Sequence, residues 1–292
     1  MRAILWGFVA CVLLAAAPAW ADSATDPVQH AMQAEDYVKA IALADQALNQ
    51  PGLPDDDVLR LHYARGIAYL MTGKPQQALD DLDFAVQNSA SETPEEKRGY
   101  AVIHFFRGLA YQMLDRQIEA IADFKIAVAN DPQEAGYYGA LGDSYYARED
   151  YDSAIAAYDE AIRLKPDFVE AYTNRGECFQ AKKEGIKALA DYNEALRLKP
   201  DFAMALNDRA TIYIEQGKPA DALADLDKAA KIEPKMAIIY LNRAYAYRLL
   251  HQWEDALADL NKALSLVDNP KGQQIIRQQI ADTQAEQAKS SP

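Results

Sequence analysis

The residues that could perform chemistry are few, and their spacing does not form a catalytic or metal-binding group. Four histidines are widely separated along the chain: His30, His62, His104 and His251. Spacings of the CxxC, HExxH and GxSxG types and of phosphate-binding loops do not occur. Adjacent acids such as Glu95-Glu96 are expected on a solvated helix face or in a loop. The sequence therefore predicts a protein that is not an enzyme and that carries no metal or cofactor.

Arginine and aspartate recur together, always at the same distance from each other along the chain. The five pairs are Arg65 and Asp81, Arg107 and Asp123, Arg175 and Asp191, Arg209 and Asp225, and Arg243 and Asp259. Where Leu141 replaces the arginine, Ala157 replaces the aspartate. Joint gain and loss predicts a partly buried, bidentate ion pair between two helices. The alternative is that the arginines form a ladder for phosphate or carboxylate ligands.

The elements that must position these pairs are repeats of constant length. Pro132, Pro166, Pro200 and Pro234 are equally spaced along the chain. Small residues return in the same phase, as in the series Ala120, Ala154, Ala188, Ala222 and Ala256. Small residues let helix axes approach closely, and large residues between them fill the gaps. Such periodicity predicts one helical unit stacked many times.

The repeat resembles the tetratricopeptide repeat (TPR), a helix–turn–helix of about 34 residues. In residues 135–166 the signature positions 4, 7, 8, 11, 20, 24, 27 and 32 are Tyr138, Leu141, Gly142, Tyr145, Ala154, Tyr158, Ala161 and Pro166. The resemblance implies an all-α, right-handed α-solenoid of about seven repeats, with the first helix of each repeat lining a concave groove. It leaves the function open, because one fold serves many functions.

The predicted segments follow from this register. They are 1–21 export signal; 22–54 degenerate first repeat; 59–92 repeat; 93–100 inserted loop; 101–134, 135–168, 169–202, 203–236 and 237–270 repeats; and 271–292 capping helix and tail. Residues 93–100 could instead lengthen the next helix, with Thr93 as its cap and Pro94 at its first position. Ile275, Ile276 and Ile280 are expected to cover the last apolar face.

Residues 1–21 predict export, with cleavage after Ala21 and a periplasmic location. Arg2 precedes an apolar core, and Ala19-Trp20-Ala21 is a typical cleavage site. The formal net charge of −14 argues against nucleic acid and anionic membranes as partners. No membrane insertion is expected after cleavage. Cys178 is then the one remaining cysteine, and we expect it to be buried, an intermolecular disulfide being the alternative.

The implied groove would be apolar near the N-terminus and polar to acidic further on. Its predicted partner-binding residues are Tyr63, Ile67, Leu70, Met71, Val102, Phe105, Phe106, Leu109, Tyr146, Asn174, Asn207, Asn242, Tyr245 and Arg248. Exposed apolar patches often mark interaction surfaces. The basic residues with which some TPR proteins hold a C-terminal carboxylate are missing. Self-coverage of the groove, by the first repeat or by a second copy, is the alternative.

These features predict a non-enzymatic scaffold or adaptor of the cell envelope that binds a protein or peptide in its groove. Two further interpretations stay open. One is a self-assembling module, a homo-oligomer whose groove is closed by a second copy. The other is a binder of a small apolar ligand or lipid. The partner and the pathway cannot be read from the residues.

Overall fold

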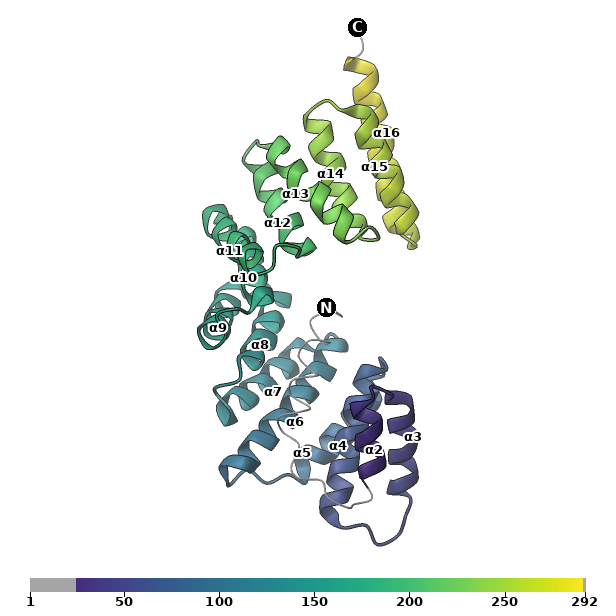
Figure 1. Ribbon diagram of the computed structural model, residues 1–292, viewed down its shortest axis with the longest axis vertical. Coiled ribbons are helices and arrows are strands. Elements are labelled where there is room, and N and C mark those ends of the chain that lie inside the picture. The colour runs from purple at the N-terminus through teal and green to yellow at the C-terminus, as the bar shows by residue number, and fades with distance from the viewer. Residues whose placement is uncertain (1–24, 291–292) are drawn as a thin grey trace. The chain divides into compact units, whose positions relative to one another are not determined.

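The computed structural model describes residues 25–290, which contain fifteen α-helices and no strand (Figure 1). The predicted export signal, residues 1–21, lies outside the described residues. The chain divides after Pro166 into two compact units. In each unit helices pair as antiparallel hairpins that stack on their neighbours in sequence. The predicted class, an all-α solenoid, is confirmed.

The helix bounds match the repeat register. The first unit contains α2 (Asp26–Gln33), α3 (Tyr37–Leu48), α4 (Asp55–Met71), α5 (Pro75–Gln87), α6 (Pro94–Met113), α7 (Gln117–Asn130), α8 (Ala135–Ala147) and α9 (Tyr151–Leu164). The second contains α10 (Val169–Ala181), α11 (Gly185–Leu198), α12 (Ala203–Glu215), α13 (Pro219–Ile232), α14 (Ala237–Leu249), α15 (Trp253–Leu266) and α16 (Pro270–Ser290).

The turn inside each repeat uses one residue in the left-handed region. Gly73 and Gly217 have φ values of 75° and 72° there. The equivalent residues of the other repeats are Glu35, Asp115, Glu149, Lys183 and His251, with φ between 57° and 62°. A residue in the left-handed region ends a helix, because it turns the backbone so that the amides after it can donate to the last carbonyls of the helix. After Gly73, for example, Lys74 N donates to Tyr69 O at 2.8 Å. His251 therefore has a turn position.

The predicted inserted loop at 93–100 is wrong: these residues form the first turns of α6 after Thr93. The Thr93 hydroxyl accepts a hydrogen bond from Glu96 N at 3.2 Å, and Glu96 Oε2 accepts from Thr93 N at 2.9 Å. This reciprocal capping box satisfies amides that the helix start leaves free. Pro94 follows at the first helical position, where no amide is needed. The alternative of a lengthened helix is the correct one.

The core of each repeat is set by size at fixed positions. Ala120 and Ala127 are fully buried, so α7 lies close to its neighbours. A Cβ added at Gly108 would lie 2.6 Å from the ring of Phe124, and one at Gly142 would lie 2.5 Å from that of Tyr158. The glycine thus makes room for an aromatic ring from the second helix. In the sixth and seventh repeats alanine stands at this position and leucine opposite it.

The final helix, α16, packs on α15 and closes the second unit. Ile276 is buried and Ile280 is partly buried against the core cluster of this unit. Ile275 is 54% exposed, so it does not belong to the covering face as predicted. Thr283 is fully buried one turn beyond Ile280. An ion pair between Arg248 and Glu286, 2.7 Å apart, also links α16 to α14.

Candidate functional site

The structure brings together all five predicted arginine–aspartate pairs. In the second repeat, Arg65 Nε donates to Asp81 Oδ2 at 2.8 Å and Arg65 Nη2 donates to Asp81 Oδ1 at 2.7 Å. The other four pairs repeat this bidentate contact, with every donor–acceptor distance between 2.7 and 2.9 Å. Each links the two helices of one repeat. In the fourth repeat Leu141 and Ala157 are buried instead.

A second arm of the same guanidinium reaches the preceding repeat. Arg107 Nη1 donates to Asp83 Oδ1 at 2.8 Å, and Arg243 Nη1 donates to Asp227 Oδ1 at 2.9 Å. Arg65 bonds Asp45 in the same way, and Arg209 bonds the amide oxygen of Asn193. The arginines are therefore structural links within and between repeats, and their donors are engaged inside the protein.

Sequence reasoning missed this second arm, although a signal for it exists. The acceptor occupies position 25 of each preceding repeat, where Asp45, Asp83, Asn193 and Asp227 stand. Before the fourth repeat this position is Lys125, which has no oxygen to offer an arginine. The following repeat has Leu141 at position 7. Comparing position 7 with position 25 of the previous repeat would have revealed the link.

Two histidines extend the network. His62 Nδ1 lies 2.7 Å from Asp81 Oδ1, and His104 Nδ1 lies 2.7 Å from Asp123 Oδ1. His62 also stacks on Phe84, with ring centroids 4.0 Å apart. In the part of the chain from 25 to 290, no three histidine, cysteine, aspartate or glutamate residues are placed to hold a metal ion. These histidines orient carboxylates, and Cys178 is buried and forms no disulfide within the residues that the structure describes.

The charges in these networks stabilise one another. Burial of Asp123 acts against its charge, but hydrogen bonds from Arg107 and His104 outweigh it and lower the pKa of Asp123. The hydrogen bond to Asp81 raises the pKa of Arg65 against the effect of burial. The Asp123 carboxylate is thus held ionised by its partners, which suits a structural role.

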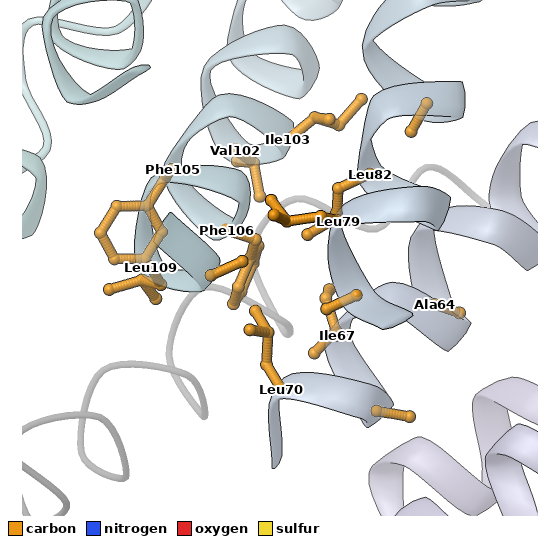
Figure 2. Packing of buried hydrophobic residues seen from close by; sticks show 14 of the residues in the cluster. Ala64, Ile67, Leu70, Leu79, Leu82, Val102, Ile103, Phe105, Phe106 and Leu109 are labelled. Atoms are coloured by element: carbon orange, nitrogen blue, oxygen red, sulfur yellow. The ribbon is translucent and has the colours of Figure 1, made fainter. Parts of the chain in front are cut away.

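The apolar part of the predicted groove is buried in the structure. Figure 2 shows how these side chains pack together between neighbouring helices of the first unit. Those that are at most 8% exposed are Ile67, Leu70, Val102, Phe105, Phe106 and Leu109. The sequence predicted that they form an exposed surface, and the structure instead places them in the core cluster.

Aromatic packing explains this burial. Phe105 contacts the rings of Phe124 and Tyr137, with centroids 5.8 and 5.0 Å away. Phe106 meets Tyr63 edge to face at 6.1 Å. Tyr137 belongs to the next first helix and is 1% exposed, so large rings from successive helices fill the space between them. Tyr63, Met71 and Tyr146 keep part of their surface exposed.

The exposed large apolar side chains on first helices lie mostly in the second unit. Met204 and Ile238 are 39% and 45% exposed, and Tyr245 and Leu249 are 50% and 42% exposed. The helices that carry them, α12 and α14, contact each other directly. Asn242 Nδ2 donates to the Asn207 amide oxygen at 2.9 Å across this contact. Of the predicted residues, Tyr245 is exposed, Arg248 is paired with Glu286, and Asn174 lies partly buried on α10.

A helix–turn–helix of fixed length, repeated with the same buried small residues and the same internal ion pairs, defines a helical-repeat protein. Family models described as TPR or tetratricopeptide repeats match residues 142–183, 169–202 and 207–272. Residues 142–202 and 207–272 therefore belong to the tetratricopeptide repeat family, as the resemblance implied. The fold of the chain is that of a protein-interaction scaffold, a kind of fold that is generally non-catalytic. The search of curated protein sequences gives no match.

Solved structures share this fold at low sequence identity. A tetratricopeptide repeat protein from Parabacteroides merdae is 19% identical, with a TM-score of 0.66 over 89% of this chain and 97% of that chain. PilF from Pseudomonas aeruginosa is 18% identical, with a TM-score of 0.63 over 77% and 98%. PilW, a type IV pilus biogenesis factor, is 18% identical, with a TM-score of 0.64 over 75% and 98%. At these identities the likeness shows the fold alone.

None of the helices between residues 25 and 290 has the length and apolar character needed to cross a bilayer.

Proposed function

We propose that this chain is an exported, non-enzymatic scaffold that binds another protein through the first helices of its second unit. The observation that carries the proposal is the row of exposed apolar side chains on α12 and α14, beside the Asn207–Asn242 hydrogen bond. Large apolar side chains that remain exposed suit binding of a peptide or helix. The Asn207 amide is only 4% exposed, and its hydrogen bond with Asn242 links the two helices that carry these side chains. The fold supports protein binding as the general role.

Export is the second part of the proposal and rests on residues 1–21. An Ala-rich apolar core after Arg2, followed by Ala19-Trp20-Ala21, supports cleavage before Asp22. The measurement is the mass of the chain recovered from periplasmic extract of a bacterial host. We expect a chain that begins at Asp22, and an uncleaved chain in the cytoplasmic fraction would refute export.

Site-specific photo-crosslinking tests the binding surface in cells. A crosslinking residue replaces Tyr245 on α14, and the control replaces Ile186 on α11, which is 86% exposed on a second helix. We expect a discrete adduct with another protein from position 245 and none from position 186. Equal labelling from both positions, or none from 245, would contradict the proposal. An adduct with the mass of two copies would instead show that the chain assembles with itself.

A further inference from the structure

One helix of the second unit, α14, carries apolar side chains on two different faces. The first face is buried in the core of the unit and consists of Ile239, Tyr240, Ala244 and Ala246. On the second face Ile238, Tyr245 and Leu249 are 45%, 50% and 42% exposed, and Leu241 is partly buried. Successive members of the second face are three or four residues apart, so they form one stripe along the helix, called here the α14 stripe.

The α14 stripe is long enough to make several contacts with one segment of a partner. Ile238 and Leu249 are eleven residues apart, which is about 16 Å along a helix that rises about 1.5 Å per residue. Met204 on α12, a helix that contacts α14, is 39% exposed and adds apolar surface. Contiguous exposed apolar surface usually marks a contact with another macromolecule.

The polar side chains beside the α14 stripe are largely engaged within the chain. Asn242 Nδ2 donates to Asn207 Oδ1 at 2.9 Å, and Asn207 Nδ2 donates to Asp208 Oδ1 at 3.0 Å. Asp208 Oδ2 is enclosed and accepts no hydrogen bond from the residues that the structure describes. Arg248 donates to both carboxylate oxygens of Glu286. The polar atoms of the stripe that could still bond a partner are the Asn242 amide oxygen and the Tyr245 hydroxyl.

This shortage of polar groups distinguishes between two shapes that a partner segment could have. An extended segment has an unpaired N–H and C=O on each residue, and the groups that face the stripe would lose water without gaining a partner. A helix pairs these groups within itself, so it can present an apolar face alone. The α14 stripe therefore suits a helix better than an extended peptide.

From this arrangement we infer that the partner binds as an amphipathic α-helix that lies along α14, with its apolar face against the α14 stripe. The inference rests on the proposed function and names the kind of partner segment for the same surface. Such a helix carries large apolar residues at every third or fourth position, so that its side chains fit between those of α14. A second copy of the chain is a less favoured occupant, because two chains of formal net charge −14 repel each other.

Photo-crosslinking from both ends of the stripe tests this inference in the cells that produce the chain. A photoreactive residue replaces Ile238 in one variant and Leu249 in another, and mass spectrometry locates the residue of the captured protein that each one labels. The control variant has the photoreactive residue in place of Ile186 on α11. All three side chains are exposed, so the variants are expected to fold, which thermal unfolding checks.

We expect the two labelled residues to lie about eleven residues apart in one segment of the partner, because about 16 Å of helix has that length. A separation of about five residues would indicate an extended segment, which rises about 3.3 Å per residue. That result would overturn the inference and leave the proposed function standing. No adduct from either end, or equal labelling from position 186, would refute both. Adducts with a second copy of the chain would make that copy the occupant and would also overturn the inference.

A synthetic peptide of the captured segment gives a second measurement. Fluorescence anisotropy compares two variants of this peptide, one with alanine and one with proline at the same central position on its polar face. We expect the alanine variant to bind as the unaltered peptide does, and the proline variant to bind about a hundredfold more weakly, because proline disrupts the interior of a helix. Equal affinities of the two variants would contradict a helical partner.

Discussion

Arg107 on α6 donates to Asp83 on α5 at 2.8 Å, across the boundary between two repeats. The same guanidinium holds Asp123 of its own repeat with two hydrogen bonds. One planar group with five donors can serve both carboxylates at once, which an ammonium group does less well. The contact couples neighbouring repeats through charge as well as through apolar packing.

The first prediction compares two losses in the free energy of unfolding. One follows removal of the arginine of a pair, and the other follows removal of both the arginine and the aspartate. Arg209→Leu leaves Asp225 buried without its cation, so we expect a loss of about 3 kcal/mol in the unfolding of the second unit. Adding Asp225→Ala reproduces the Leu141 and Ala157 of the fourth repeat and should recover much of this loss. Urea unfolding of the single and double variants measures the difference.

The control for this prediction is Arg197→Leu. Arg197 bonds Glu194 at 2.7 Å on an exposed helix face, where solvent screens the pair. We expect no measurable change in its urea midpoint. If the double variant at 209 and 225 is no more stable than Arg209→Leu alone, the unpaired Asp225 carboxylate is not the cause of the loss, and the prediction is wrong.

The second prediction concerns acid. Hydrogen bonds from Arg107 and His104 lower the pKa of Asp123 in the folded chain in spite of its burial. A carboxylate with a lowered folded pKa stabilises the fold above its unfolded pKa of about 4, and this contribution is lost as pH falls through the folded value. The urea midpoint should therefore drop on acidification below about pH 4. Asp123→Asn should have a lower midpoint at neutral pH and a shallower acid dependence, and an unchanged acid dependence would contradict this.

The third prediction concerns Asp208, whose charge is expected to destabilise the fold at neutral pH, in contrast to that of Asp123. The pKa of Asp208 is raised to about 6, above its unfolded value, so its charge opposes folding at neutral pH. Asp208→Asn should stabilise the second unit by up to about 3 kcal/mol at neutral pH, and the gain should vanish below about pH 4. Thermal unfolding against pH, with Asp201→Asn as the matched charge control, measures this. A variant that is less stable at neutral pH would show that the carboxylate has partners in solution.

The fourth prediction concerns size at position 8 of the repeat. A Cβ at Gly108 would meet the Phe124 ring at 2.6 Å, so Gly108→Ala should cost about 1–3 kcal/mol through overpacking. Adding Phe124→Leu reproduces the alanine and leucine of the sixth repeat and should recover part of that loss. Gly66→Ala is the control. A Cβ at Gly66 would lie 3.0 Å from the Leu82 side chain, so this substitution should reduce stability less than Gly108→Ala. Equal losses at 66 and 108 would refute the size rule.

The repeat architecture and the ion pairs within repeats could be predicted because each is written several times in one chain. The equal spacing of the prolines that begins with Pro132 fixes the register, and the joint change to Leu141 and Ala157 indicates a contact. The link from Arg107 to Asp83 was missed because the comparison stayed inside single repeats. The start of α6 was misassigned as a loop, since Pro94 can begin a helix as well as interrupt one.

The candidate surface was harder to predict for a different reason. Whether Phe105 faces a partner or its own neighbours depends on the rings beside it, and Tyr137 and Phe124 come from other helices. Family geometry assigns a direction to each position but not the size of what lies opposite. The sequence predicts a polar to acidic groove in this region but does not single out Asp208. Its missing hydrogen-bond partner is a property of three-dimensional arrangement that no periodicity encodes.

The link between position 7 of one repeat and position 25 of the repeat before it also constrains how such a chain can evolve. Lys125 lies over the Tyr145 ring, its ammonium 5.6 Å from the ring centroid, and precedes a repeat whose position 7 is Leu141. A duplicated, deleted or exchanged repeat would have to bring a compatible neighbour with it, because an arginine placed after Lys125 would meet a like charge. Neighbouring repeats of this chain are therefore matched at these two positions and are not freely interchangeable units.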